Sequence, residues 1–268
     1  MYGRDADLAA LRAEGARITC YHSTTIMRVG FFVTCLVDLV RPAVGFAAIK
    51  LLKSGGADVY VPPLQTCCGQ PAYNSGDRSD AIALARKVVG EFEDCDYLVA
   101  PSGSCSGMIK THYGELFRGD ATMETRVAKL AAKTHELTDF LVNVLEVKAP
   151  TGQYKGKITY HDSCAGLREM GVKGQPRALL AAMPGVELIE MAECETCCGF
   201  GGTFSIKYGD ISARLADNKC VHVQNSGAEA VVLGDLGCML NIEGRLRRRG
   251  DTKTRVLHVA EVLADEAS

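Results

Sequence analysis

Short apolar runs alternate with longer amphipathic segments along most of this chain. A continuous apolar run between turn residues is typical of a strand buried on both faces, and six such runs predict strands at 28–34, 58–61, 97–100, 157–160, 186–190 and 230–233. Helical periodicity between them predicts helices at 37–53, 77–93, 176–183 and 210–225. Strands that alternate with helices indicate right-handed βαβ units and therefore parallel sheets.

The chain contains an internal repeat. The first half reads FFVTC, TCCGQPAYNSGD and VAPSGSC, and the second half reads ITYHDSC, TCCGFGGTFSIKYGD and VVLGDLGC. The offsets between matching cysteines are 129, 130 and 133 residues for the pairs Cys35 and Cys164, Cys67 and Cys197, and Cys105 and Cys238. Three nearly equal offsets with matching local sequence indicate a duplication.

The repeat predicts the domain organisation. We expect an α/β fold of two tandem, duplicated, parallel-sheet (Rossmann-like) domains related by pseudo-twofold symmetry, at 27–147 and 157–268. The segment between them is rich in Pro, Gly and Lys, as linkers are. Residues 1–26 form an N-terminal extension that contains Cys20 and no strand pattern, so we expect their deletion to leave cofactor content unchanged.

Composition narrows the chemistry. The 268 residues carry 30 Lys and Arg against 32 Asp and Glu, a net charge of −2 that argues against a nucleic-acid-binding protein. The apolar runs are too short to span a membrane, and the N-terminus lacks the apolar core of a signal peptide, so a cytoplasmic location is expected. Twelve cysteines in such a chain indicate metal binding or redox chemistry.

Eight of the cysteines follow predicted strands. They are Cys35, Cys67, Cys68, Cys105, Cys164, Cys197, Cys198 and Cys238. Because ligands bind beyond the carboxyl ends of parallel strands, we expect four sulfurs of each half to converge at one sheet edge. Four thiolates from three distant loops suit an iron–sulfur cluster, and Gly69 and Gly199 allow the tight turn that lets both sulfurs of a pair face one cofactor.

Two other uses of these cysteines are open. Zinc also accepts four thiolates, although structural zinc sites usually contain close Cys-x2-4-Cys pairs, which do not set the spacing here. A structural disulfide is less favoured, because adjacent cysteines bridge only with a strained peptide. The spacing of the cysteines therefore favours an iron–sulfur cluster.

The cysteine motifs resemble those of a known family. GFFVTC, TCCGQPAYNSG, APSGSC, ETCCGFGGTFSIKYGDIS, GCMLNIEGRLRR and LHVAEVL, between Met27 and Leu263, are similar to motifs of the lactate utilization protein A family. Its cysteine-rich CCG domain also resembles that of the CCG-containing subunit of heterodisulfide reductase and of the glycolate oxidase iron–sulfur subunit. The resemblance implies an electron-transferring oxidoreductase subunit of a three-protein system that oxidises L-lactate to pyruvate. A further iron–sulfur protein and a third subunit are the implied partners, and a quinone is a candidate acceptor.

Two positions depart from the fuller CCG pattern, which ends in Cys-x-x-Cys. Ser102 and Asp235 stand where that pattern has a further cysteine, so each half has four cysteines rather than five. A simple [4Fe–4S] cluster in one or both halves is the expected cofactor. Ser102 and Asp235 are candidates for an additional oxygen ligand, although iron of this kind prefers thiolate.

The other cysteines are open to simpler interpretations. Cys194 forms a Cys-x-x-Cys with Cys197 and is either a spare ligand or a bystander; Leu64 stands at its place in the first half. Cys95 and Cys220 are expected to be small packing residues.

His161 and the basic run at 245–249 have alternative roles. His161 either bonds to the backbone at a strand end, or hydrogen-bonds a cluster sulfur or relays a proton to an acceptor. The basic run is either a solvated helix end or a docking site for an acidic partner or membrane surface. Three alternative functions remain at this point: a disulfide-reducing enzyme like heterodisulfide reductase, an iron–sulfur subunit like that of glycolate oxidase, and a zinc-stabilised scaffold.

Overall fold

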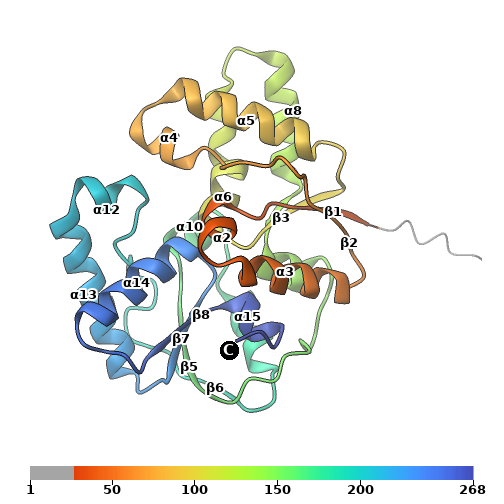
Figure 1. The fold of residues 1–268 in the computed structure, drawn as a ribbon. Helices are drawn as coiled ribbons and strands as arrows, with labels where there is room; N and C mark the ends of the chain where they lie inside the picture. Colours follow the sequence, from red (N-terminus) through yellow and green to blue (C-terminus); the bar gives the residue numbers. More distant parts are fainter. Residues whose placement is uncertain (1–26, 268) are drawn as a thin grey trace, which may run out of the picture.

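The structure, a computed structural model, describes residues 27–267 and has the predicted α/β architecture (Figure 1). It contains two parallel sheets of four strands, one in each half of the chain. The predicted extension at 1–26, with Cys20, lies outside the described residues, so its dispensability stays a prediction.

Both sheets have the same strand order. The first contains β1 (Arg28–Phe31), β2 (Asp58–Tyr60), β3 (Tyr97–Ala100) and β4 (Thr134–Glu136) in the order β2-β1-β3-β4. The second contains β5 (Gly156–His161), β6 (Val186–Leu188), β7 (Ala230–Leu233) and β8 (Arg255–His258) in the order β6-β5-β7-β8. All neighbouring strands are parallel, so the two halves share one topology.

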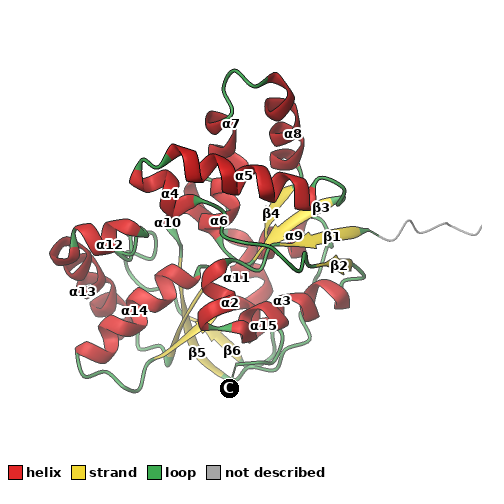
Figure 2. Ribbon diagram, turned by 45° about the horizontal axis from the view of Figure 1, so that its top comes forward, coloured by secondary structure: helices red, strands yellow, loops and turns green. Residues whose placement is uncertain are grey.

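Helices lie on both sides of each sheet (Figure 2). Those of the first half are α2 (Cys35–Val40), α3 (Pro42–Ser54), α4 (Gln70–Ser75), α5 (Arg78–Phe92), α6 (Gly103–Gly107), the π-helix η1 (Met108–His112), α7 (Tyr113–Leu116), α8 (Ala121–Ala132) and α9 (Leu137–Asn143). Those of the second half are α10 (Cys164–Arg168), α11 (Gly174–Ala181), α12 (Thr203–Lys207), α13 (Gly209–Asn225), α14 (Leu236–Arg248) and α15 (Val259–Leu263). No helix among residues 27–267 combines the length and the apolar character that crossing a membrane requires.

One predicted helix is wrong as a single element. The segment 37–53 contains two helices, because α2 ends at Val40 and α3 begins at Pro42. Proline has no N–H to donate within a helix but fits its first turn, so the chain breaks and restarts there. The other predicted elements lie close to the observed ones, and the strands at 97–100 and 230–233 coincide with β3 and β7.

The sequence pattern does not predict the edge strands β4 and β8. Their sequences are short: THE contains no apolar residue, and RVLH contains only two, between Arg255 and His258. Each ends in a buried polar residue that caps the next helix. Glu136 accepts the N–H of Thr138 at 2.7 Å, and Nδ1 of His258 accepts the N–H of Ala260 at 3.2 Å. These strands are therefore stabilised by tertiary contacts that local periodicity does not report.

Glu136 is expected to make stability depend on pH. Burial raises its pKa to about 7, although hydrogen bonds from Thr138 and Asp139 oppose this. Because the unfolded chain releases this proton near pH 4.3, ionisation destabilises the fold as the pH rises through about 7. We expect a loss of about 2 kcal/mol in the free energy of unfolding from about pH 5 to about pH 8, absent in Glu136→Gln. Denaturant unfolding at both pH values measures it, and equal pH dependence in the two proteins would contradict it.

The last helix of each half packs against a helix of the other half. α15 of the second half packs on α3 of the first, and the equivalent α9 packs on α11. Arg41 and Glu261 form a 2.8 Å ion pair across the first of these contacts. One buried apolar cluster contains residues of both sheets, such as Phe31 and Ile158. Each half therefore completes its core against the other.

The carboxyl edges of the sheets face each other. α6 packs on α10, and α2 packs on α14, as pseudo-twofold symmetry requires; α2, α6 and α10 lie together between the sheets in Figure 1. Gly103 of α6 approaches α10 so closely that a Cβ there would lie 2.6 Å from Cα of Gly166. The loops that follow the strands of the two halves consequently meet at the centre of the molecule.

Candidate functional site

The predicted cysteines lie at these facing edges. Cys35 and Cys164 are the first residues of α2 and α10. Cys105 and Cys238 lie in the first turns of α6 and α14. The partial positive charge at a helix N-terminus favours a thiolate or another anionic group.

The first set of four cysteines lines one cavity. This cavity has a volume of about 390 Å³, and Cys35, Cys67, Cys68 and Cys105 are in its wall. The sulfurs of Cys68 and Cys105 are 3.5 Å apart. The buried Tyr113 donates its hydroxyl proton to the carbonyl of Cys68 at 2.8 Å and so holds the loop. The space far exceeds the roughly 30 Å³ of one water molecule, so a group larger than one ion fits there.

The second set lines a similar cavity. Its volume is about 340 Å³, and Cys164, Cys197, Cys198 and Cys238 are in its wall. The side-chain amide of Asn241 donates to the carbonyl of Cys198 at 2.9 Å, which is the role of the Tyr113 hydroxyl in the first half. The structure thus brings together all four predicted residues of each half, and the cysteines of the described residues are free thiols.

A left-handed glycine follows each cysteine pair. Gly69 has φ +84° and Gly199 has φ +87°, a conformation that only glycine adopts without strain. The turn places the glycine N–H 3.4 Å from the sulfur of Cys67 and 3.3 Å from that of Cys197. Both cysteines of each pair therefore reach the same cavity, and one receives a backbone hydrogen bond.

The thiols of each set affect one another's ionisation. Hydrogen bonds from Cys35 and then Cys68 lower the pKa of Cys67 to about 3, whereas the bond to Cys67 and burial raise the pKa of Cys35. In the second half, the bond from Cys164 is the main cause that lowers the pKa of Cys197 to about 2. Crowded thiols of this kind ionise together only when a bound cation compensates their charge.

The two cavities share a wall. The residues that line both are Gln70, Asn74, Ser104, Phe200, Gly202 and Asp235. Asp235 is buried, and one of its oxygens accepts the N–H of Ser104 at 2.9 Å and the hydroxyl of Ser102 at 3.0 Å. A single carboxylate therefore links the two halves between the two sets of cysteines.

Ser102 and Asp235, the candidate oxygen ligands, lie at equivalent places. They are the N-cap residues of α6 and α14, and their side chains hydrogen-bond each other. Capping and mutual bonding account for both side chains. A role as additional iron ligands stays a prediction.

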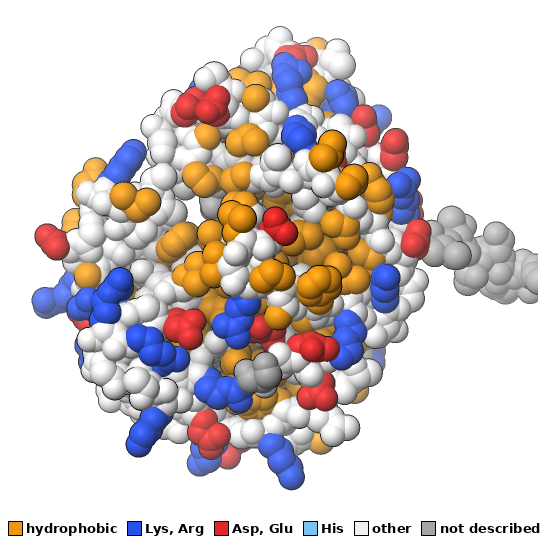
Figure 3. All heavy atoms as spheres, in the orientation of Figure 1, with side chains coloured by type: hydrophobic (Ala, Val, Ile, Leu, Met, Phe, Trp, Pro, Cys, Tyr) orange, Lys and Arg blue, Asp and Glu red, His pale blue; other side chains and the backbone are white. Residues whose placement is uncertain are grey.

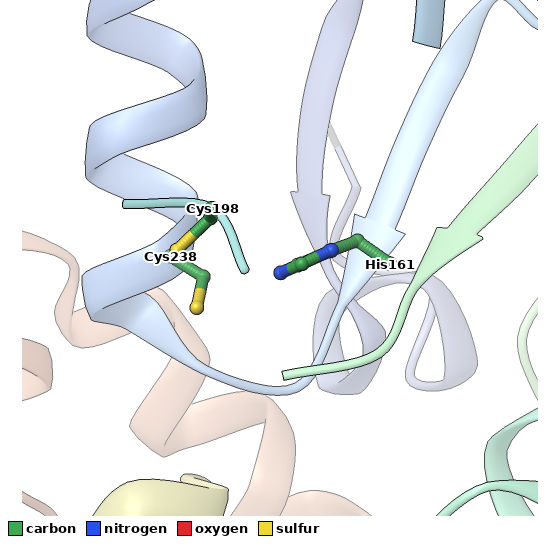
Figure 4. Close-up of side chains that lie close together, drawn as sticks. All are labelled: His161, Cys198 and Cys238. Atoms are coloured by element: carbon green, nitrogen blue, oxygen red, sulfur yellow. The ribbon is translucent and has the colours of Figure 1, made fainter. Parts of the chain in front are cut away.

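His161 points into the second set of cysteines. It ends β5, is fully buried, and directs its ring toward Cys198 and Cys238, with ligand atoms of all three within 4.8 Å of one another (Figure 4). Neither ring nitrogen has a hydrogen-bond partner in the described part of the chain, although buried polar groups are nearly always paired. Burial lowers the pKa of His161 to about 3, whereas the backbone of Cys194 acts in the opposite direction, so the backbone-bonded alternative stays a prediction beside the cluster-bonded one.

These features together fit a metal or iron–sulfur cofactor. Each cavity offers four thiols and space beyond that of a single ion. The unpaired ring of His161 adds a donor that lacks only an acceptor. Soft thiolate sulfurs select zinc, copper(I) or iron–sulfur clusters among biological metals.

The remaining cysteines lie outside the cavities. Cys95 is buried within the apolar cluster of the first half, and Cys220 within the cluster that contains residues of both halves. Cys194 packs at the edge of the core and is absent from the described walls of both cavities. Arg245 and Arg249, from the basic run, both pair with Asp217 and so tie α14 to α13.

Three residues of the site were not predicted from the sequence. Tyr113 and Asn241 hold the cysteine loops, and Lys219 lies buried beneath the second loop. Lys219 is the one detectable in principle, since it falls among the apolar positions of the helix predicted at 210–225. The hydrogen bonds of the other two depend on the fold alone.

Known protein families match the parts of the chain that contain these eight cysteines. The model of the cysteine-rich CCG domain matches residues 29–110 and 158–243. Lactate utilization protein A of Geobacillus kaustophilus is 47% identical over 237 residues, which are 88% of this chain and 98% of that protein. Lactate utilization protein A 2 of Bacillus cereus is 43% identical over 238 residues, with 89% and 98% covered.

A solved structure shares the fold. A hypothetical protein from Helicobacter pylori aligns with 90% of this chain at a TM-score of 0.65 and 11% identity, and the chain covers 48% of that protein. The sequence matches and the two cysteine-lined cavities lead to one conclusion. The chain belongs to the lactate utilization protein A family of cysteine-rich CCG-domain proteins.

Proposed function

We propose that this chain is a cytoplasmic electron-transfer subunit that carries iron–sulfur clusters in a multi-protein system oxidising L-lactate to pyruvate. The main support is the pair of four-cysteine cavities that share one wall, which suits the passage of electrons between two centres. Relatives that are 42–47% identical bear the name lactate utilization protein A.

We infer one [4Fe–4S] cluster in each cavity. Its thiolate ligands in the first half are Cys35, Cys67, Cys68 and Cys105, and in the second half Cys164, Cys197, Cys198 and Cys238. Such a cluster, when bound, accepts and releases single electrons. The protein contributes the thiolates, the N–H groups of Gly69 and Gly199, and a wall that keeps the two centres apart.

We assign lactate binding to a partner subunit. Oxidation of lactate to pyruvate releases two electrons and two protons, and its carboxylate is usually held by Arg or Lys. The described walls of both cysteine cavities contain neither residue. The role left for this chain is to accept the electrons, one at a time, from the subunit that oxidises lactate.

An exposed apolar face lies beside the first centre. Apolar side chains gather over α2 and α3 (Figure 3), and Leu39, Phe46 and Leu64 are 79%, 73% and 76% exposed. Leu39 also lines a cavity of about 350 Å³ that reaches Cys35 and Cys67. Exposed apolar patches of this kind mark contact sites for other proteins. We assign this face to the further iron–sulfur protein of the system.

Anaerobic purification tests the cofactor assignment. We expect a brown protein with about eight iron atoms and about eight acid-labile sulfides per chain, and an electron paramagnetic resonance (EPR) signal after reduction. Stoichiometric zinc without sulfide would overturn the assignment, since a zinc-stabilised scaffold is colourless and carries no electrons.

Growth on L-lactate tests the pathway assignment. A strain that lacks this chain should fail to grow on L-lactate and should still grow on pyruvate. The wild-type gene and Cys95→Ser should restore growth, because Cys95 lies outside both cavities, whereas Cys198→Ser should not. Undiminished growth of the deletion strain on L-lactate would contradict the proposal.

A further inference from the structure

The helices behind the two cysteine loops can be aligned residue by residue. The buried residues of α5 are Ala81, Ala85, Val88, Val89 and Phe92, and those of α13 are Ser212, Ala216, Lys219, Cys220 and Val223, with the same spacing. The glycine turns give the same register, because the Cβ position of Gly69 meets Ala81 and Leu84 whereas that of Gly199 meets Ser212 and Leu215. Lys219 therefore occupies the place that Val88 has in the first half.

The strands give a second such pair. His161 lies three residues before Cys164, as Phe32 lies three residues before Cys35, and both are fully buried. Phe32 packs edge-on against Phe92, with ring centroids 6.0 Å apart. The first half thus has apolar side chains behind its cysteines, whereas the second half has a histidine and a lysine at the corresponding places.

Lys219 brings a positive charge close to the second centre. Its ammonium is buried and donates hydrogen bonds to the carbonyls of Glu193 and Cys194, the latter at 3.3 Å. Burial lowers its pKa, and the thiol of Cys194, followed by those of Cys198 and Cys238, acts in the opposite direction.

Three carboxylates also lie near this centre, and Glu169, which lines its cavity, faces the ring of His112 at 3.5 Å. Asp162 forms two 2.8 Å hydrogen bonds with Arg177, whose guanidinium also pairs with Glu190 at 2.6 Å. Asp235 lies in the wall common to both cavities, so it acts on both centres. Neither cavity wall contains Lys or Arg among the described residues, so the contrast between the halves lies in the layer behind the cysteines, where Lys219 takes the place of Val88.

We propose that His161 and Lys219 give the centre of the second half a more positive reduction potential than that of the first half. The inference rests on the proposed iron–sulfur function. Reduction adds a negative charge, which a nearby ammonium stabilises strongly where water is excluded. A ring N–H donated to a cluster sulfur acts in the same direction. One electron therefore passes downhill from the reduced first centre to the oxidised second centre, and the direction of transfer is set by these two side chains.

A redox titration followed by EPR tests this. Anaerobic wild-type protein should show two potentials. Cys68→Ser and Cys198→Ser, which each retain one centre, assign the more positive potential to the second half. Lys219→Met and His161→Phe should each move that potential in the negative direction and leave the potential of the first centre unchanged.

His161→Phe introduces the residue type that Phe32 has at the equivalent place in the first half, so this variant still tests the inference if Lys219→Met fails to fold. Lys157→Met, an exposed lysine of β5, is the matched control and should move neither potential.

The outcomes separate this inference from the proposed function. Two iron–sulfur centres with equal potentials, or a potential that stays unchanged in both Lys219→Met and His161→Phe at full iron and sulfide content, would overturn the inference alone. Protein that binds no sulfide-containing centre would overturn the proposed function first. Equal shifts in Lys157→Met would show a general effect of net charge and would also overturn the inference.

Discussion

Cys68→Ser is expected to remove the iron of the first half and to retain that of the second, so that total iron falls by about half. Cys68 is buried, and its sulfur lies 3.5 Å from that of Cys105, so its loss cannot be compensated by a thiol of the other half. A serine hydroxyl stays protonated at neutral pH and binds cluster iron poorly. Cys198→Ser should do the reverse. Iron and sulfide counts on anaerobic protein measure both.

Cys95→Ser and Cys220→Ser are the matched controls for these variants. Both cysteines are buried, and neither is in the described walls of the two cavities, so we expect full iron and a modest loss of packing energy. Equal iron loss in all four variants would show that the internal repeat does not define the ligands. Loss of all iron in either Cys68→Ser or Cys198→Ser would instead favour one centre shared across the common wall.

Gly199→Ala is expected to lower the free energy of unfolding more than alanine substitutions at the other left-handed glycines Gly69 and Gly76. The left-handed φ of +87° costs a residue with a Cβ about 1–2 kcal/mol. The new Cβ would also lie 2.5 Å from the carbonyl oxygen of Ser212 and 3.0 Å from Cβ of Leu215. Overpacking against backbone adds about 1–3 kcal/mol, so we expect a total of about 3 kcal/mol, together with loss of iron from the second centre. Denaturant unfolding and iron content measure the two effects.

Two other glycines separate strain from crowding. Gly76 has φ +82° and open space around its Cβ position, so Gly76→Ala should show the strain alone. Gly69 has φ +84°, and its Cβ position is 3.4 Å from the carbonyl oxygen of Ala81, so its loss should be only slightly larger. If all three variants lose the same stability, the contact with Ser212 contributes nothing and the expectation for Gly199 is wrong.

The local pattern of apolar and polar residues was sufficient to predict the α/β architecture. Apolar runs gave the positions of β3 and β7 to the residue, because a strand buried on both faces leaves an uninterrupted apolar signal. Pro42 was sufficient to break the helix predicted at 37–53 into two helices, and the periodicity of apolar residues alone did not show this break. The edge strands β4 and β8 escaped prediction because they are short and end in polar residues, although most of their residues are buried in the fold.

The sequence by itself determined the duplication and the eight cysteines, because both are periodic features that repeat with matching neighbours. Only the tertiary structure decided how the two sets relate. The last helices of the two halves, α9 and α15, and the contact between Gly103 and Gly166 bring the two sheet edges face to face, so that Asp235 lies between both cavities. Spacing along the chain also does not reveal that Lys219 and His161 lie behind one set and apolar residues behind the other. That difference arises because side chains distant in sequence become neighbours only when each half folds.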